Sequence, residues 1–169
     1  MIHYRDAEPH EGATLGGIAR ATFIETFGHL YNLNDLASFL EKGSDTAQST
    51  ELADPALEVR FACAGSTPIG FAKLSGITLP VEPAGPAIEL RQLYIFKPWH
   101  GQGIAEALMD WVHTRAAARS AQEIWLSVWA ENHRARRFYA RQGFTEIRPY
   151  AFMVGEQADE DILCRKVLK

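Results

Sequence analysis

A strand, a glycine turn and a helix follow one another between Glu89 and Ala105, and this stretch constrains the fold more than any other. The alternating apolar residues from Leu90 to Phe96 predict a β-strand, which Pro98 ends. The next residues, Gly101-Gln102-Gly103, predict a tight turn into a helix. Apolar residues then recur with the spacing of one buried helical face: Ile104, Leu108, Trp111 and Val112. The chain therefore contains an α/β unit whose helix begins directly after a glycine turn.

A glycine turn at a helix N-terminus is a potential anion site. The N–H groups of the first helical turn have no acceptor inside the helix, the helix dipole is positive at this end, and glycine lets a phosphate approach the backbone. We therefore predict that the backbone from Gly101 to Ala105 binds a pyrophosphate. Two other nucleotide signatures fit less well, because the Gly-Lys-Ser/Thr of a Walker A loop is absent and Glu106 stands where a Rossmann fingerprint needs glycine or alanine.

Composition predicts one globular domain, residues 1–169. With 169 residues and 47% hydrophobic content, the chain is long enough for a core of its own. The formal net charge is −4 and no basic run occurs, which argues against binding to nucleic acid or to a membrane. The absence of a bilayer-spanning segment and of a signal-peptide core favours a cytoplasmic protein, in which Cys63 and Cys164 are reduced and packed. Neither the cysteines nor the histidines have metal-ligand spacing, so we expect no metal site.

Hydrophobic periodicity predicts helices and strands that alternate along the chain. The expected helices cover residues 11–30, 33–42, a segment from 104 onward, and a short helix through 142 that Asn132 caps. The expected strands cover residues 2–6, 58–64, 68–79, 90–96, 123–129, 144–154 and 162–168. Between them we expect a polar segment at 44–54, a loop rich in proline and glycine at 78–86, and an acidic turn at 155–161. This order predicts an α/β fold with a mixed sheet.

Two motifs resemble those of one enzyme family. The segment from His100 to Ala105 is similar to the acetyl-coenzyme A motif Gln/Arg-x-x-Gly-x-Gly/Ala of the GCN5-related N-acetyltransferases, the GNAT family. The segment from Asn132 to Tyr139, followed by Gly143-Phe144, resembles the family's Asn-x-x-Ala-x-x-Phe-Tyr…Gly-Phe segment at the expected distance. The order of elements matches as well, so the resemblance covers almost the whole chain. Within the family, residues 88–95, 124–144 and 150–168 are most similar to the bacterial spermidine/spermine acetyltransferases of the PaiA type.

The resemblance implies a fold and an activity. The GNAT fold has a mixed, mostly antiparallel sheet flanked by helices, with strands splayed around the acetyl-CoA cleft. The implied reaction transfers acetyl from acetyl-CoA to a primary amine, here of a small polyamine-like molecule, by direct attack in a ternary complex. Acetylation of a peptide N-terminus or an amino-acid amine is an alternative, and a non-catalytic coenzyme A-binding module is another. Homodimers are common in the family, so a homodimer is one possible assembly.

Two residues are candidates for acid–base chemistry. An alkylamine has a pKa of about 10, so it is mostly protonated at neutral pH and must lose a proton before it attacks a thioester. Several family members have a glutamate base at the strand position of Glu89, often acting through a water. The alternative role for Glu89 is that of a solvated edge carboxylate. The resemblance places the hydroxyl of Tyr139 near the coenzyme A sulfur, where a phenol can protonate the leaving thiolate. Its alternative role is that of a core aromatic.

The resemblance also assigns the cofactor contacts. Backbone groups of Leu93, Tyr94 and Ile95 are expected to pair with the pantetheine arm like an added strand, and one N–H of this segment to hold the thioester oxygen. Asn132 is expected to contact the pantetheine or phosphate arm in addition to capping its helix. The phosphate turn comprises six residues: His100, Gly101, Gln102, Gly103, Ile104 and Ala105. His100 departs from the family pattern, which has Gln or Arg at this position.

The acceptor is expected to bind between the first helices and the loop that precedes the Glu89 strand. Three acidic residues of these helices have the charge to attract a polycation: Glu25, Asp35 and Glu41. The loop at 78–86 contributes only one acid, Glu82. The sequence therefore predicts the cofactor site in more detail than the acceptor site.

Overall fold

The computed structural model describes all 169 residues and confirms the α/β fold. Seven strands form one sheet in the order β1-β2-β3-β4-β5-β7-β6. Only β4 and β5 are parallel, and every other neighbouring pair is antiparallel. The strands are β1 (Ile2–Asp6), β2 (Glu58–Ala64), β3 (Thr67–Ser75), β4 (Ala87–Ile95), β5 (Glu123–Trp129), β6 (Thr145–Val154) and β7 (Gln157–Val167).

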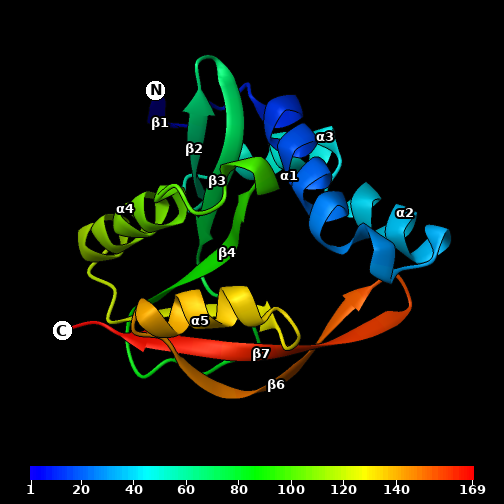
Figure 1. Cartoon of the computed structure of the whole chain (residues 1–169). Helices are drawn as coiled ribbons and strands as arrows, with labels where there is room; N and C mark the ends of the chain where they lie inside the picture. The colour runs from blue at the N-terminus through cyan, green and yellow to red at the C-terminus, as the bar shows by residue number, and fades with distance from the viewer.

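Five α-helices flank this sheet (Figure 1). They are α1 (Gly12–Phe27), α2 (Leu33–Lys42), α3 (Asp45–Leu52), α4 (Ile104–Ala118) and α5 (His133–Arg141). One 3₁₀ turn, Gly28–Leu30, follows α1, and another, Lys97–Trp99, follows β4. Each of the helices is too short or too polar to cross a membrane.

The helices form separate cores on the two faces of the sheet. Helix α4 buries Leu108 and Val112 in the larger core, which Phe138 of α5 also joins. On the other face, α1 buries Leu15 against Phe61 and other residues of β2 and β3. Cys63 and Cys164 are buried and not joined to each other, as predicted. Burial on both faces fixes the sheet between two helical layers.

A bulge in β4 determines which side chains face each layer. Lys73 of β3 pairs with Gln92 and Leu74 pairs with Leu90, so Arg91 is an extra residue in β4. As a result, Leu90 and Leu93 both pack in the core beneath α4 although three positions separate them. Without the bulge, the alternation along β4 would place one of them on the opposite face.

Strands β4 and β5 pair over only three residues and then separate. The parallel ladder runs from Ala87–Glu123 to Glu89–Trp125, whereas β4 continues to Ile95. The predicted splay between these strands is therefore present. Beyond Glu89 the facing edges of both strands have no strand partner, which leaves an opening in the middle of the sheet.

Three sequence predictions about elements were wrong. The polar segment at 44–54 contains α3, which Ser44 caps by accepting from the Ala47 N–H at 3.2 Å. Its only buried residue is Gln48, so apolar periodicity gives no sign of it. The predicted acidic turn at 155–161 belongs mostly to β7, because inward-facing acids break the apolar pattern of that strand. Strand β4 begins at Ala87 and β3 ends at Ser75, so Glu89 is the third residue of its strand.

Candidate active site

The opening between β4 and β5 is part of a cleft of about 790 Å³. All but one of the predicted site residues line it, and these come from β4, the glycine turn, α4 and α5. The exception is Gln102, whose side-chain amide donates to the Pro98 carbonyl at 3.2 Å. The tertiary structure therefore brings the two sequence motifs to one cavity.

The glycine turn has the geometry of an anion site. Gly101 and Gly103 have φ angles of +75° and +77°, a region that favours glycine. A Cβ added at either position would meet no atom within 4 Å, so the space above the turn is open. The first hydrogen bond of α4 runs from the Ala107 N–H to the Gly103 carbonyl, and the N–H groups before Ala107 have no helical acceptor. This turn therefore fits a pyrophosphate.

His100 connects the end of β4 to the start of α5. Its Nε2 lies 2.7 Å from the Ile95 carbonyl oxygen, and the Arg134 guanidinium contacts its Nδ1. A guanidinium can only donate, so Nδ1 accepts and Nε2 carries the proton that it donates to Ile95. Both ring nitrogens are thus used within the protein, and His100 holds the turn in place. Arg134, an unassigned position of the second motif, adds a positive charge beside the turn.

The exposed edge of β4 lies next to this turn. Leu93 and Ile95 pack against the core beneath α4, whereas Tyr94 packs against the α1 side. Pairing with β5 stops at Glu89, so the backbone of this segment is open to the cleft on one edge. An extended amide-containing chain can hydrogen-bond to such an edge as an added strand.

Glu89 lies at the point where β4 and β5 separate. Its residue is 5% exposed, and its carboxylate accepts hydrogen bonds from the backbone N–H groups of Thr78 at 2.6 Å and Leu79 at 3.1 Å. The Thr78 hydroxyl lies 3.0 Å from both carboxylate oxygens. Glu89 therefore lines the cleft and also anchors the loop that follows β3, which the sequence did not indicate.

Helix α5 contributes Tyr139 and its N-cap residue Asn132 to the lining of the cleft. Burial raises the pKa of Tyr139, so its hydroxyl remains protonated at neutral pH. No protein group hydrogen-bonds this hydroxyl, while the ring packs on Phe138 and Phe144 with centroids 5.4 and 5.7 Å away. Asn132 caps α5 by accepting from the Ala135 N–H at 3.2 Å. The Tyr139 hydroxyl is thus available to a molecule in the cleft.

The part of the cleft next to α1 is aromatic and acidic. Phe27 contacts Trp129 and Tyr94, with ring centroids 5.9 and 6.4 Å apart. Two acids of β7, Asp159 and Asp161, line the same region. Sequence reasoning assigned both acids to a turn and missed them. Their alternation with Glu160 on a strand was the signal that could have identified them.

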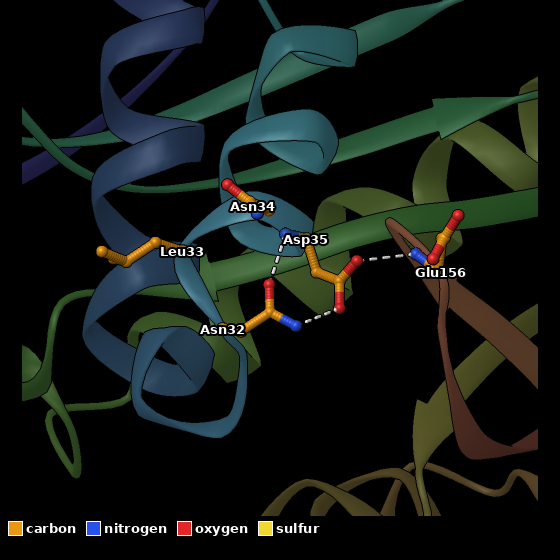
Figure 2. Close-up of a pocket in the computed structure, with 5 residues that line it drawn as sticks. All are labelled: Asn32, Leu33, Asn34, Asp35 and Glu156. Atoms are coloured by element: carbon orange, nitrogen blue, oxygen red, sulfur yellow. Dashed lines mark hydrogen bonds between the residues drawn. The ribbon is translucent and has the colours of Figure 1, made fainter.

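The helical acids that were expected to attract an acceptor do not line the cleft: Glu25, Asp35 and Glu41. The Glu25 carboxylate accepts from the backbone N–H of Lys97 at 3.1 Å. Asp35 joins α2 to the turn between β6 and β7 (Figure 2), because its carboxylate accepts from Asn32 at 2.7 Å and from the Glu156 N–H at 2.8 Å. Asp35 therefore holds the wall of the cleft in place.

A glycine turn with the geometry of an anion site, an exposed strand edge and an acid-lined opening meet in one cleft, an arrangement that suits a transferase for acyl-coenzyme A and an amine. The family model described as the acetyltransferase (GNAT) family matches residues 24–144, more than half of the chain. The chain belongs to this family and is an acetyl-CoA-dependent N-acetyltransferase.

Relatives and solved structures agree with this assignment. An uncharacterized N-acetyltransferase of Mycobacterium tuberculosis is 33% identical over 148 residues, which cover 87% of this chain and 91% of the relative. An uncharacterized N-acetyltransferase of Lactobacillus delbrueckii subsp. lactis is 29% identical over 153 residues, covering 89% and 88% of the two chains. The PaiA N-acetyltransferase of Thermoplasma acidophilum, solved with coenzyme A, superposes with a TM-score of 0.79 at 22% identity over 99% of both chains. The last comparison confirms the fold.

Proposed function

We propose that this N-acetyltransferase acetylates a primary amine of a small polyamine-like molecule, by direct attack in a ternary complex. The separation of β4 and β5 carries the ternary-complex part of this proposal, because it leaves one cleft that both the glycine turn and the acids of β7 line. In this proposal acetyl-CoA binds at the glycine turn, and the amine binds where Asp159 and Asp161 line the cleft. The resemblance of residues 88–95, 124–144 and 150–168 to the spermidine/spermine acetyltransferases of the PaiA type supports this class of acceptor.

In this proposal the donor binds mainly through the backbone. The N–H groups from Gly101 to Ala105 receive the pyrophosphate, and Arg134 adds positive charge beside them. The β4 edge from Leu93 to Ile95 pairs with the pantetheine amides, and one of its N–H groups stabilises the oxygen that becomes negative in the transition state. Asn132 holds the start of α5 against the same arm.

The chemical step needs one base and one proton donor. Glu89 removes the proton from the ammonium through a water, and the freed lone pair attacks the thioester carbon. A C–N bond forms, the C–S bond breaks, and the electron pair leaves with the sulfur. Tyr139 donates its hydroxyl proton to this sulfur, and the second proton that the attacking nitrogen loses on becoming an amide returns to the tyrosine oxygen through water. Holding both substrates in one cleft removes the need for a protein nucleophile.

An assay that detects free thiol tests the proposal. Purified protein is incubated with acetyl-CoA and, separately, spermidine, spermine, putrescine, amino acids and short peptides. Fast thiol release with the polyamines is the expected result. Release only with peptides or amino acids keeps the chemistry and overturns the polyamine assignment. Binding of acetyl-CoA without turnover on any amine would instead favour the non-catalytic module.

A further inference from the structure

We propose that Asp161 is the residue that binds the ammonium group of the acceptor, next to a cluster of aromatic rings in the cleft. This inference rests on the proposed function, since it concerns the amine side of the same cleft. It narrows the acceptor to an amine whose cationic nitrogen is carried on apolar carbon, with no carboxylate next to it.

Asp161 differs from the other carboxylates that line the cleft because it is buried with neither a basic partner nor more than one hydrogen-bond donor; Glu89, which is equally buried, accepts from the N–H groups of Thr78 and Leu79. Five acids line it: Glu51, Glu89, Glu106, Asp159 and Asp161. Glu51 is paired with Lys73 and Arg91, and Glu106 is exposed. Asp159 receives the Tyr31 hydroxyl and the Gln157 amide. Asp161 has no ion pair with any basic side chain, and Ser127 is its one hydrogen-bonding neighbour.

The burial of Asp161 makes this lack of a partner significant. The residue is only 6% exposed, yet it lines the cleft. Burying a carboxylate without a cation is costly, and burial together with nearby Asp159 raises the pKa of Asp161 to about 6. At neutral pH the group is therefore mostly an anion in a poorly solvated place. A bound ammonium supplies the missing positive charge, and its attraction to the carboxylate offsets the free energy that burying the anion costs.

A cluster of aromatic rings begins next to this carboxylate. Asp161 is the register partner of Trp129 in the β5–β7 ladder, so the two side chains stand on the same face of the sheet. Trp129 packs edge-on against Phe27, and Phe27 packs against Tyr94. Such rings attract a cation through their faces and cover the carbon chain that carries it. An amino acid would bring its own carboxylate toward Asp159 and Asp161, which repel it.

The carboxylate is also close to the point of transfer. Asp161 contributes to the raised pKa of Tyr94, and Tyr94 contributes to the raised pKa of Tyr139. Each of these groups therefore lies within electrostatic range of the next. An ammonium at Asp161 therefore lies in the same cleft as Tyr139 and Glu89, the candidate acid and base.

The test compares Asp161→Asn with Glu160→Gln. Glu160 precedes Asp161 on β7 and is exposed, so its variant makes the same charge change outside the cleft. Binding of 2-phenylethylamine to protein saturated with coenzyme A, which permits no turnover, is measured by calorimetry. KM and kcat are then measured for 2-phenylethylamine and spermidine with acetyl-CoA.

We expect Asp161→Asn to weaken amine binding and raise KM at least about tenfold, as loss of a charge-assisted contact does, while kcat and acetyl-CoA affinity stay near wild type. Glu160→Gln should match wild type. Equal amine affinity in Asp161→Asn and wild type would overturn the proposal, as would no amine binding to wild type. A fall in kcat at unchanged KM would also overturn it, by making Asp161 the base. Amine binding that depends on Asp161 without any turnover would leave the ammonium site intact and refute the proposed function.

Discussion

The Glu89 carboxylate accepts the backbone N–H of Thr78 at 2.6 Å, which ties the loop after β3 to the point where β4 and β5 separate. The same residue is the candidate base. Removing its charge therefore affects two properties, the position of this loop and the removal of a proton from the amine, and experiments must separate them.

We predict that Glu89→Gln lowers kcat by at least about 100-fold, the usual contribution of a general base. The variant also loses stability, because a glutamine amide cannot accept all the hydrogen bonds that the carboxylate accepts from the loop. Thr78→Ala is the control, since it removes only the hydroxyl contacts and should cost stability with little change in kcat. Full activity of Glu89→Gln at every pH would exclude Glu89 as the base.

Tyr139→Phe should reduce kcat by about 100-fold while the acetyl-CoA dissociation constant and the melting temperature stay near wild type. The reason is that the hydroxyl has no protein partner, whereas the ring keeps its contacts with Phe138 and Phe144. Tyr4→Phe, in β1 and outside the cleft, is the matched control. Unchanged turnover in Tyr139→Phe would show that water, and not Tyr139, protonates the leaving thiolate.

Gly103→Ala should weaken acetyl-CoA binding by at least tenfold, about 1.4 kcal/mol, because a methyl group then stands where phosphate approaches the turn. Gly65→Ala is a close control. Both glycines have positive φ, at +77° and +59°, and neither Cβ would meet another atom. Each variant should lose about 1–2 kcal/mol of stability from backbone strain, but only Gly103→Ala should lose affinity in calorimetry. Equal affinities would show that phosphate does not bind at this turn.

The raised pKa of Asp161 predicts that this residue lowers the stability of the folded protein as the pH rises. Its pKa is about 6 in the folded protein against an ordinary value of 3.8, so the folded state holds its proton more tightly than the unfolded state. This group therefore lowers the free energy of unfolding as pH rises from about 4 to 6, by at most about 3 kcal/mol. Asp161→Asn should be more stable than wild type at pH 7.5 and similar to it at pH 3.5. Denaturant unfolding at the two pH values checks this, and a variant destabilised at pH 7.5 would contradict it.

Asp35→Ala should loosen the wall of the acceptor cavity. The change removes the contact with the Glu156 N–H and one contact with Asn32, at a cost of about 1–3 kcal/mol. Because α2 and the β6–β7 turn then separate more easily, the KM for the amine should rise while acetyl-CoA affinity is unchanged. Asn32→Ala removes the helix cap but keeps the Glu156 contact, so its amine KM should stay near wild type. An equal rise in the amine KM of both variants would show that Asp35 acts only through the cap of α2 and not through its contact with Glu156.

The elements that were predicted correctly depend on residues adjacent in sequence. The strand β5, from Glu123 to Trp129, has the predicted bounds because its β-branched and aromatic run is continuous. The N-cap of α5 at Asn132 likewise follows from one side chain and the helix that it starts. Helix α3 escaped prediction because it is almost entirely polar, and its position depends on packing against α1 rather than on its own periodicity.

The sequence by itself determined the elements at which the donor is proposed to bind. A phosphate turn, a strand edge and a capped helix are local features, specified by the φ preference of glycine, by alternation and by capping. The tertiary structure alone decided which residues form the proposed acceptor site. Tyr31 and Asp159 meet across 128 residues, and Asp161 stands beside Trp129 only because β7 inserts between β5 and β6. Contacts of this range depend on which strands pair, and no local sequence pattern encodes that choice.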